Sequence, residues 1–195
     1  MPNKVEIMVR TLFKVILAGE GSVGKTSLRR RFMGDKFQKA YAMTIGADFS
    51  VKKMKIEGHE ISFSIWDLAG QSHFKAVRPA FYKGAQAAFV VFSTVERASF
   101  EAVPNWVNEV WTYTSKDIPM LLVGNKIDLR EQFLNRPAFR DTIVLKEEGE
   151  AYAKKLSEAA GHEIQYIETS ALTGENVNKM FEIMGLEILR ANNLI

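Results

Sequence analysis

The chain has 195 residues, of which 47% are hydrophobic and 25% are charged, a composition typical of a globular protein. This length suits one domain with a full core, so we expect a single domain over residues 1–195. The net charge of +3 is too small to favour a nucleic-acid partner, and the absence of cysteine excludes disulfides, thiolate metal sites and a catalytic thiol.

Apolar, β-branched runs alternate with helical patterns along the chain. The run FKVILA at 13–18 predicts a buried strand, and residues 26–33 predict the helix that follows it. The segment 48–67 alternates in polarity on both sides of EGH, which is typical of a hairpin. Further short buried strands are predicted at 87–93, 119–126 and 164–170.

Helical patterns fill the intervals between these strands. One helix is predicted after Pro104 within 98–113, because proline fits the first turn of a helix and breaks an interior turn. Two more are predicted at 146–161, ending at Gly161, and at 174–193. The last helix carries an apolar stripe that predicts one buried face, formed by Val177, Met180, Phe181, Met184 and Ile188.

The densest basic run is Arg29-Arg30-Arg31, in the first predicted helix. Such a run is either a contact for a phosphate backbone or a solvated helix face, and we favour the solvated face.

The alternation of strands and helices indicates the fold class. We expect an α/β fold in which a mostly parallel six-stranded sheet has one antiparallel edge strand and helices on both faces. Ligands of such sheets bind at the carboxyl ends of the strands. The unusual residue clusters of this chain all follow predicted strands, so we expect them to lie at one edge of the sheet.

The first cluster is GEGSVGKT at 19–26, which fits the phosphate-binding pattern G-x-x-x-x-G-K-[ST] between a strand and a helix. Its backbone N–H groups and the helix N-terminus can hold an anion. Lys25 would place a positive charge on the outer phosphates, and the Thr26 hydroxyl would ligate Mg²⁺. The alternative is a glycine-rich turn that fits by chance. The loop by itself indicates a nucleoside triphosphate and leaves the base and the reaction open.

The second cluster, GNKID, ends the predicted strand at 119–126. Guanine presents N1–H and N2–H₂ side by side, so the carboxylate of Asp128 can accept both hydrogen bonds, whereas adenine offers a bare acceptor. Asn125 can brace the loop and reach the purine, and the methylenes of Lys126 can cover a ring face. In ETSAL at 168–172, the backbone N–H of Ala171 can serve guanine O6. An ordinary hydrophilic turn is the alternative interpretation.

The third cluster is SIWDLAGQ, at the end of the predicted hairpin. Asp67 leaves a buried strand and can hold Mg²⁺ through water. Gly70 leaves its N–H free to approach a γ-phosphate, and Gln71 can orient an attacking water. A strand-ending turn is the alternative, because D-x-x-G is a weak pattern alone.

In this order, GEGSVGKT, TIG, WDLAGQ, GNKID and ETSAL resemble the Ras superfamily of small GTPases. The resemblance covers the chain from about residue 12 to residue 190. It implies the P-loop NTPase fold of small G proteins, with GTP or GDP as the bound nucleotide and Mg²⁺ as the cofactor. It also implies that Thr44 caps Mg²⁺ and the γ-phosphate in the GTP state, and that Phe37 packs against the guanine.

The expected site residues fall into three groups. Those expected to take part in catalysis are Lys25, Gly70 and Gln71. Those expected to hold the metal are Thr26, Thr44 and Asp67. Those expected to contact the nucleotide are Gly19, Glu20, Gly21, Ser22, Val23, Gly24, Lys25, Thr26, Ser27, Phe37, Tyr41, Thr44, Gly70, Asn125, Lys126, Asp128, Leu129, Ser170, Ala171 and Leu172.

Within the superfamily the chain most resembles the Rab branch, through TIGADF and FYKGAQAAFVVF. Phe49, Trp66 and Phe81 fall where Rab proteins carry an aromatic triad for effectors, and local core packing is an equally good interpretation. Two features resemble Rho proteins instead, namely SFEAVPNW and the long segment 130–145. Ser72 replaces the glutamate that usually follows the catalytic glutamine.

Two functions fit these observations. The first is a switch that binds GTP with Mg²⁺, hydrolyses it to GDP and presents the loops around Thr44 and Gln71 to effectors, with membrane trafficking as the expected setting. The alternative is a constitutive GTP-binding scaffold with negligible hydrolysis. A kinase or ATPase is disfavoured by GNKID together with ETSAL. Because Arg78, the nearest arginine, lies well past Gln71 on the far side of a loop, we expect slow hydrolysis without an arginine from a partner.

The resemblance also implies the partners, which are effector, exchange-factor and GTPase-activating proteins. We expect a cytoplasmic monomer that reaches a membrane through such partners. A direct lipid anchor is not expected, because the chain has neither a cysteine nor a glycine after its first methionine.

Overall fold

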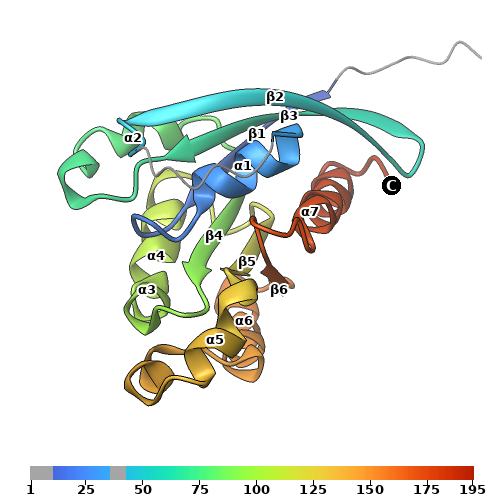
Figure 1. The fold of residues 1–195 in the computed structure, drawn as a ribbon. Helices are drawn as coiled ribbons and strands as arrows, with labels where there is room; N and C mark the ends of the chain where they lie inside the picture. The colour runs from blue at the N-terminus through green and yellow to red at the C-terminus, as the bar shows by residue number, and fades with distance from the viewer. Residues whose placement is uncertain (1–10, 36–42) are drawn as a thin grey trace, which may run out of the picture.

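One six-stranded sheet organises the chain in the order β2-β3-β1-β4-β5-β6. A computed structural model describes residues 11–35 and 43–195. The strands are β1 (Thr11–Ala18), β2 (Ala47–Ile56), β3 (His59–Leu68), β4 (Ala87–Ser93), β5 (Met120–Asn125) and β6 (Gln165–Thr169). β2 and β3 pair antiparallel, and all other neighbours pair parallel. The expected α/β fold with one antiparallel edge strand is confirmed (Figure 1).

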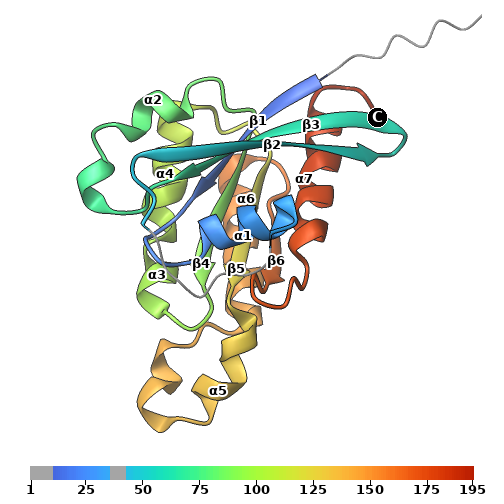
Figure 2. The same ribbon diagram turned by 45° about the horizontal axis from the view of Figure 1, so that its top comes forward.

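Helices cover both faces of this sheet (Figures 1 and 2). On one face lie α1 (Lys25–Met33) and α7 (Val177–Ala191), whose Phe32 and Phe181 rings stack with centroids 3.6 Å apart. Phe181 also meets Phe63 and Phe89 edge-on, so the two helices and two strands share one aromatic core. The predicted stripe of α7 is buried along its whole length.

The opposite face carries α2 (Arg78–Tyr82), α4 (Val103–Tyr113) and α6 (Lys146–Ala160). Their apolar side chains bury β4 and β5 from this side, through Trp106, Val107, Val110, Ala153 and Leu156. β4 and β5 are therefore buried along every residue, as strands of a parallel sheet covered on both faces must be. Burial of these two apolar layers supplies the main driving force for folding.

The helix predicted after Pro104 forms, but a separate short helix precedes it. α4 begins at Val103 with Pro104 in its first turn, where proline costs no hydrogen bond. Before it lies α3 (Arg97–Glu101), which the proline argument did not predict. Ser99 of α3 is buried, donates to Glu96 O at 2.7 Å and accepts from Ser93 N at 2.9 Å, so it fastens the short helix to the end of β4.

The long segment 130–145 also has structure of its own. It contains α5 (Arg130–Leu134) and a 3₁₀ helix over Pro137–Thr142, whose facing rings Phe133 and Phe139 lie 5.2 Å apart. In both views the segment lies at the end of the molecule remote from the β2–β3 hairpin (Figures 1 and 2).

The hairpin makes one side of the sheet, with β2 as the edge strand. Its tight turn is Glu57-Gly58, both with positive φ, so His59 is the first residue of β3 and not part of the turn. Along β2 the outward residues change from apolar to basic. Phe49 and Val51 are exposed in its first half, and Lys53 and Lys55 in its second half.

Candidate functional site

The glycine-rich segment 19–26 forms the turn between β1 and α1, at the carboxyl edge of the sheet. Gly24, directly before the helix, has a φ of 103°, and a side chain there would meet the Asn125 amide 2.2 Å away. Val23 is fully buried beneath the turn, and Ser22 is exposed with a φ of 64°. Among the residues that the structure describes, no side chain caps the N-terminus of α1, so its first backbone N–H groups can receive an anion at the turn.

Lys25 is folded back over this turn. Its Nζ donates to the carbonyls of Gly19 and Glu20, at 2.6 and 2.7 Å. Burial lowers the pKa of Lys25 to about 8, and the negative charges of Asp67 and Glu20 oppose that shift. An anionic ligand beside this buried ammonium would favour its charged form and so offset the cost of burial. Ser27, two residues on, is half-buried on α1.

Three oxygen-bearing side chains converge beside the start of α1. Thr26 Oγ1 donates to Asp67 Oδ2 at 2.5 Å and lies 2.9 Å from Thr44 Oγ1, which itself lies 3.4 Å from Asp67 Oδ2. Asp67 is fully buried, and among the described residues its Oδ1 has no hydrogen-bond partner. Burial raises the pKa of Asp67, and the Thr26 hydrogen bond and the Lys25 charge oppose the shift. The structure thus brings together the three residues predicted to hold a metal.

Arg29 departs from its prediction as part of a solvated helix face. It is 7% exposed and lies on the buried side of α1, with Lys25, Leu28 and Phe32. Its guanidinium pairs with Asp48 on β2 and lies 4.0 Å from Asp67. The interpretation failed because a run of like residues on a helix points in different directions, and one position in three or four faces the core.

Gly70 and Gln71 lie against the same turn. A side chain on Gly70 would meet the main chain of Glu20 and Gly21 at 2.4 Å, so only glycine permits this approach. The Gln71 side chain lies over Gly21, where a Cβ would be 3.5 Å from Gln71 Nε2. The glutamine therefore lies above the turn at 19–26, and its role in orienting a water stays a prediction.

The expectation that Arg78 lies far from Gln71 is wrong. Arg78 is 3% exposed, and its Nη1 donates to Gln71 O at 3.2 Å. Its Nε and Nη2 pair with the Glu109 carboxylate at 2.5 and 2.8 Å, and its guanidinium lies 4.5 Å from the Trp106 ring centre. The 3₁₀ turn Ser72–Phe74 and the following bend shorten the path between the two residues, which their separation in sequence does not reveal.

Trp106 continues this chain of contacts to the phosphate-binding turn, because its Nε1 donates to Glu20 Oε1 at 3.0 Å. The same side chains line one wall of a cleft of about 530 Å³ between α4 and the segment after Gly70. A series of polar contacts therefore joins α4, Gln71 and the turn that it covers.

Asn125 links the three loops of the predicted base-reading end. It is 1% exposed, and its Nδ2 donates to Val23 O at 2.9 Å. Its Oδ1 accepts from Ala171 N and from Thr169 Oγ1, both at 3.2 Å. The bracing role expected of Asn125 is thus present in the geometry. The Ala171 N–H that the sequence assigns to guanine O6 is directed at Asn125 in this structure.

Asp128 lies beside this brace. Its Oδ1 accepts from Ser170 Oγ at 2.5 Å, and Ser170 Oγ also accepts from Thr173 N at 3.0 Å. Lys126 has a φ of 71°, and burial lowers the pKa of Lys126. Leu129 is half-buried, and Leu172 is 42% exposed at the rim. The predicted base-reading residues therefore surround one position at the ends of β5 and β6.

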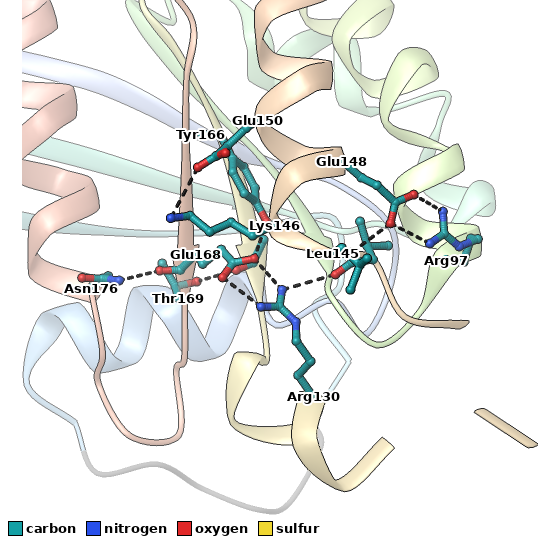
Figure 3. A network of polar contacts seen from close by, with 12 residues as sticks. Arg97, Arg130, Leu145, Lys146, Glu148, Glu150, Tyr166, Glu168, Thr169 and Asn176 are labelled. Atoms are coloured by element: carbon teal, nitrogen blue, oxygen red, sulfur yellow. Dashed lines mark hydrogen bonds and ion pairs between the residues drawn. The ribbon is translucent and has the colours of Figure 1, made fainter. Parts of the chain in front are cut away.

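A polar network that sequence reasoning did not find fastens these loops from behind (Figure 3). Arg130, two residues after Asp128, pairs through two nitrogens with the Glu168 carboxylate at the end of β6. Tyr166 donates to the same carboxylate at 3.0 Å, and Asn176 Nδ2 donates to Glu168 O at 2.8 Å. The sequence shows an arginine shortly after β5 and a glutamate near the end of β6. It does not show that the two pair, because their pairing depends on the strand order.

The same network closes the long segment 130–145. Arg130 Nη2 donates to Val144 O at 3.3 Å, which joins the start of the segment to its end. Arg97 of α3 pairs with Glu148 (Figure 3). Arg97 Nε also donates to Asp141 O at 3.2 Å. The extra segment is therefore anchored at its base, next to the loop that carries Asp128.

The three aromatic residues that fall at the positions of the Rab effector triad, from β2, β3 and α2, form one continuous group. Phe49 stacks on Trp66 with ring centres 5.3 Å apart, and Trp66 lies 6.1 Å from Phe81. Phe49 is 60% exposed, so packing in the core does not account for it. Phe37 and Tyr41, which were predicted to contact the nucleotide, lie outside the described residues.

Comparison with known proteins places this geometry in context. A model of the Ras family matches residues 14–190. Ras-related protein Rab-18 of Caenorhabditis elegans is 38% identical over 185 residues, or 94% of this chain and 83% of the relative. Ras-related protein RABA5a of Arabidopsis thaliana is 40% identical over 177 residues, or 91% and 73%. Ras-related protein Rab-19 of Mus musculus is 33% identical over 183 residues, or 94% and 78%. Among the helices of residues 11–35 and 43–195, none is long and apolar enough to cross a membrane.

Proposed function

Because the chain belongs to the Ras family of small GTPases and is similar to Rab proteins, we propose that it is a guanine-nucleotide switch. In this proposal residues 1–195 act as one GTPase domain that binds GTP or GDP with Mg²⁺. The domain hydrolyses GTP and changes its surface around Thr44 and Gln71 when the γ-phosphate is lost.

One observation carries the proposal. Thr44 and Gln71 come from two separate segments, and both meet the phosphate-binding turn, Thr44 through the 2.9 Å contact with Thr26 and Gln71 above Gly21. A terminal phosphate at that turn would touch both segments at once, and its loss would release both. A scaffold that merely holds a nucleotide has no need of two such contacts.

The three converging oxygens suit Mg²⁺, which prefers hard oxygen ligands. The buried Asp67 Oδ1 has no hydrogen-bond partner among the described residues, and such an atom is available to a cation or its water. We assign Thr26, Thr44 and Asp67 to the metal, which when bound neutralises charge on the outer phosphates. Lys25 adds a positive charge from the turn, Gly70 offers its N–H to the γ-phosphate, and Gln71 orients the attacking water.

For the base, the proposal assigns the choice of guanine to Asp128, supported by the packed surroundings of its carboxylate. Ser170 fixes one carboxylate oxygen at 2.5 Å, and Asn125 holds the neighbouring loops together. A carboxylate held in one orientation discriminates more strongly between donors and acceptors than a mobile one.

Hydrolysis is expected to be slow without a partner. Arg78 is close to Gln71, but its guanidinium is paired with Glu109 and stacked on Trp106, so it is not directed at the phosphates. An arginine from a GTPase-activating protein would supply that charge. Exchange factors and effectors are the other proposed partners. Membrane trafficking is the proposed setting, at a cytoplasmic membrane surface reached through these partners.

Single-turnover hydrolysis tests the proposal against a constitutive scaffold. The protein is loaded with radiolabelled GTP and Mg²⁺, and bound GDP is measured over time with and without excess unlabelled ATP. We expect GTP to be retained against ATP and converted slowly to GDP. Stable retention of unhydrolysed GTP would favour the scaffold, and displacement by ATP would reject the guanine assignment.

A further inference from the structure

Two carboxylates face each other across the hairpin that carries the proposed metal site. Asp48 of β2 and Asp67 of β3 are partners in the antiparallel ladder. Like charges directly opposite on neighbouring strands destabilise a sheet. Here the repulsion is strengthened because Asp67 is fully buried, although Asp48 keeps 57% of its side chain exposed.

Arg29 of α1 lies between these two carboxylates. It pairs directly with Asp48, and its Nε lies 4.0 Å from Asp67 Oδ2 without a hydrogen bond to any described residue. Its side chain is only 8% exposed, so water screens these charges weakly. A guanidinium stays protonated at all physiological pH values. A permanent positive charge on α1 therefore lies against the hairpin and offsets part of the negative charge at Asp67.

The same oxygen of Asp67 belongs to the proposed metal site, since Oδ2 also receives the Thr26 hydroxyl. A metal ion near Asp67 and the guanidinium of Arg29 would be attracted by one carboxylate and would repel each other. Lys25 contributes positive charge as well, but its Nζ is bonded to carbonyls of the phosphate-binding turn. Arg29 thus places a positive charge on the hairpin side of Asp67.

We infer that Arg29 is a resident counter-cation that weakens Mg²⁺ binding, so that nucleotide retention needs a higher Mg²⁺ concentration than it would with a neutral residue at this position. The inference rests on the proposed function, in which Asp67 takes part in holding the metal. It assigns Arg29 a tuning role, in which the residue acts on the metal through Asp67 and does not contact the nucleotide.

The test measures how nucleotide release depends on free Mg²⁺. The wild-type protein is loaded with methylanthraniloyl-GDP, and its release rate is followed by fluorescence across Mg²⁺ concentrations set by an EDTA buffer. The Mg²⁺ concentration at half-maximal retention is the readout. Arg29→Met keeps an unbranched buried side chain without charge and should lower this midpoint about tenfold, as expected for removal of one nearby charge. Arg29→Lys should keep the midpoint within about threefold of wild type.

Two further variants fix the sign of the effect. Arg30→Met removes a charge from the next helix position, outside the buried face of α1, and should leave the midpoint unchanged. Asp48→Asn leaves Asp67 as the one carboxylate partner of Arg29 within residues 11–35 and 43–195, and should raise the midpoint about threefold. Because Asp48 is largely exposed, Asp48→Asn provides a test even if Arg29→Met fails to fold.

The outcomes separate this inference from the function on which it rests. If wild type binds the analogue in a Mg²⁺-dependent way and Arg29→Met leaves the midpoint unchanged or raises it, the inference is wrong and the proposed function stands. If wild type does not bind the analogue at all, both are rejected. Opposite shifts for Arg29→Met and Asp48→Asn would support the inference, and equal shifts would overturn it.

Discussion

The two ends of the candidate site are held in different ways. At the proposed base-reading end, buried or half-buried side chains are hydrogen-bonded to one another, as Asn125 is to two neighbouring loops and Glu168 is to Arg130. At the phosphate end, Thr44 lies between Met43 and Ile45, which are 53% and 80% exposed. Segments with few buried contacts open at low free-energy cost, whereas braced loops do not. A switch needs both properties, because the base must stay bound while the response to the phosphate changes.

The largest effect is expected from a substitution at the braced end of the site, at Asp128, the residue proposed to recognise the base. In the proposed site, Asp128→Asn replaces a carboxylate that would accept from guanine N1–H and N2–H₂ by an amide that offers one acceptor and one donor. Xanthine carries a carbonyl in place of the guanine amino group, so it should be favoured instead. We expect the preference for GTP over xanthosine triphosphate to fall by about 10³, since a buried polar mismatch is costly.

Competition of both nucleotides against a fluorescent analogue measures this change. Glu131→Gln, an exposed acid on the neighbouring α5, is the matched control and should leave the preference unaltered. A variant Asp128→Asn that keeps wild-type GTP affinity and ignores the xanthine nucleotide would remove Asp128 from base recognition.

The next effect concerns the phosphate end. Gln71→Leu keeps the size of the side chain and removes the groups that can align water above Gly21. Single-turnover GTP hydrolysis should fall about 100-fold, because misplacing a reactant costs a factor of that order. GTP affinity should stay near wild type, since Lys25 and the turn are unaltered. Ser72→Ala, at the exposed neighbouring position, serves as the control. Wild-type turnover in Gln71→Leu would exclude Gln71 from the mechanism.

A smaller effect tests whether the bracing network matters for binding. Glu168→Gln removes the charge that Arg130 pairs with, and both side chains are less than 20% exposed. We expect GDP to dissociate about tenfold faster, the equivalent of about 1.4 kcal/mol, since a charged hydrogen-bonded pair loses one partner. The rate of bound GTP hydrolysis should not change. Glu163→Gln, an exposed acid just before β6, controls for net charge. An unchanged dissociation rate would show that the brace is not needed for retention.

The smallest effect should come from the contact between Arg78 and the backbone of Gln71. Arg78→Met removes the hydrogen bond to Gln71 O and the pair with Glu109. Gln71 would keep its chemistry and lose part of its orientation, so intrinsic hydrolysis should fall about threefold to tenfold with little change in GTP affinity. Lys75→Met, exposed at the same cleft, is the control. A larger loss of affinity than of hydrolysis would assign Arg78 to folding of the segment instead.

The sequence predicted those parts of the structure that depend on local pattern. The turn 19–26 between a strand and a helix follows from its glycines, and the buried stripe of α7 follows from helical periodicity. Thr26 and Asp67 could be assigned to one site because strand ends gather at one edge of a parallel sheet, whereas Thr44 could be assigned only through the resemblance to small GTPases.

The remaining contacts depend on strand order and loop path, which local pattern does not contain. Arg29 looked like one more solvated arginine, because nothing near it in sequence shows that β2 places Asp48 opposite Asp67. Arg78 looked distant from Gln71, because the 3₁₀ turn between them is encoded weakly. Arg130 and Glu168 are 38 residues apart and meet only because β5 and β6 are neighbours.

The change from apolar to basic outward residues along β2 affects how readily the protein aggregates in concentrated solution. An exposed edge strand can pair with the edge of another molecule, and outward lysines oppose such pairing. Lys53 and Lys55 protect the half of β2 near the hairpin tip, whereas Phe49 and Val51 leave the half near Thr44 unprotected. The lysines thus oppose aggregation along the part of the edge that is farthest from the surface around Thr44 and Gln71. The apolar part contains about two outward residues, which is too short for a stable intermolecular sheet.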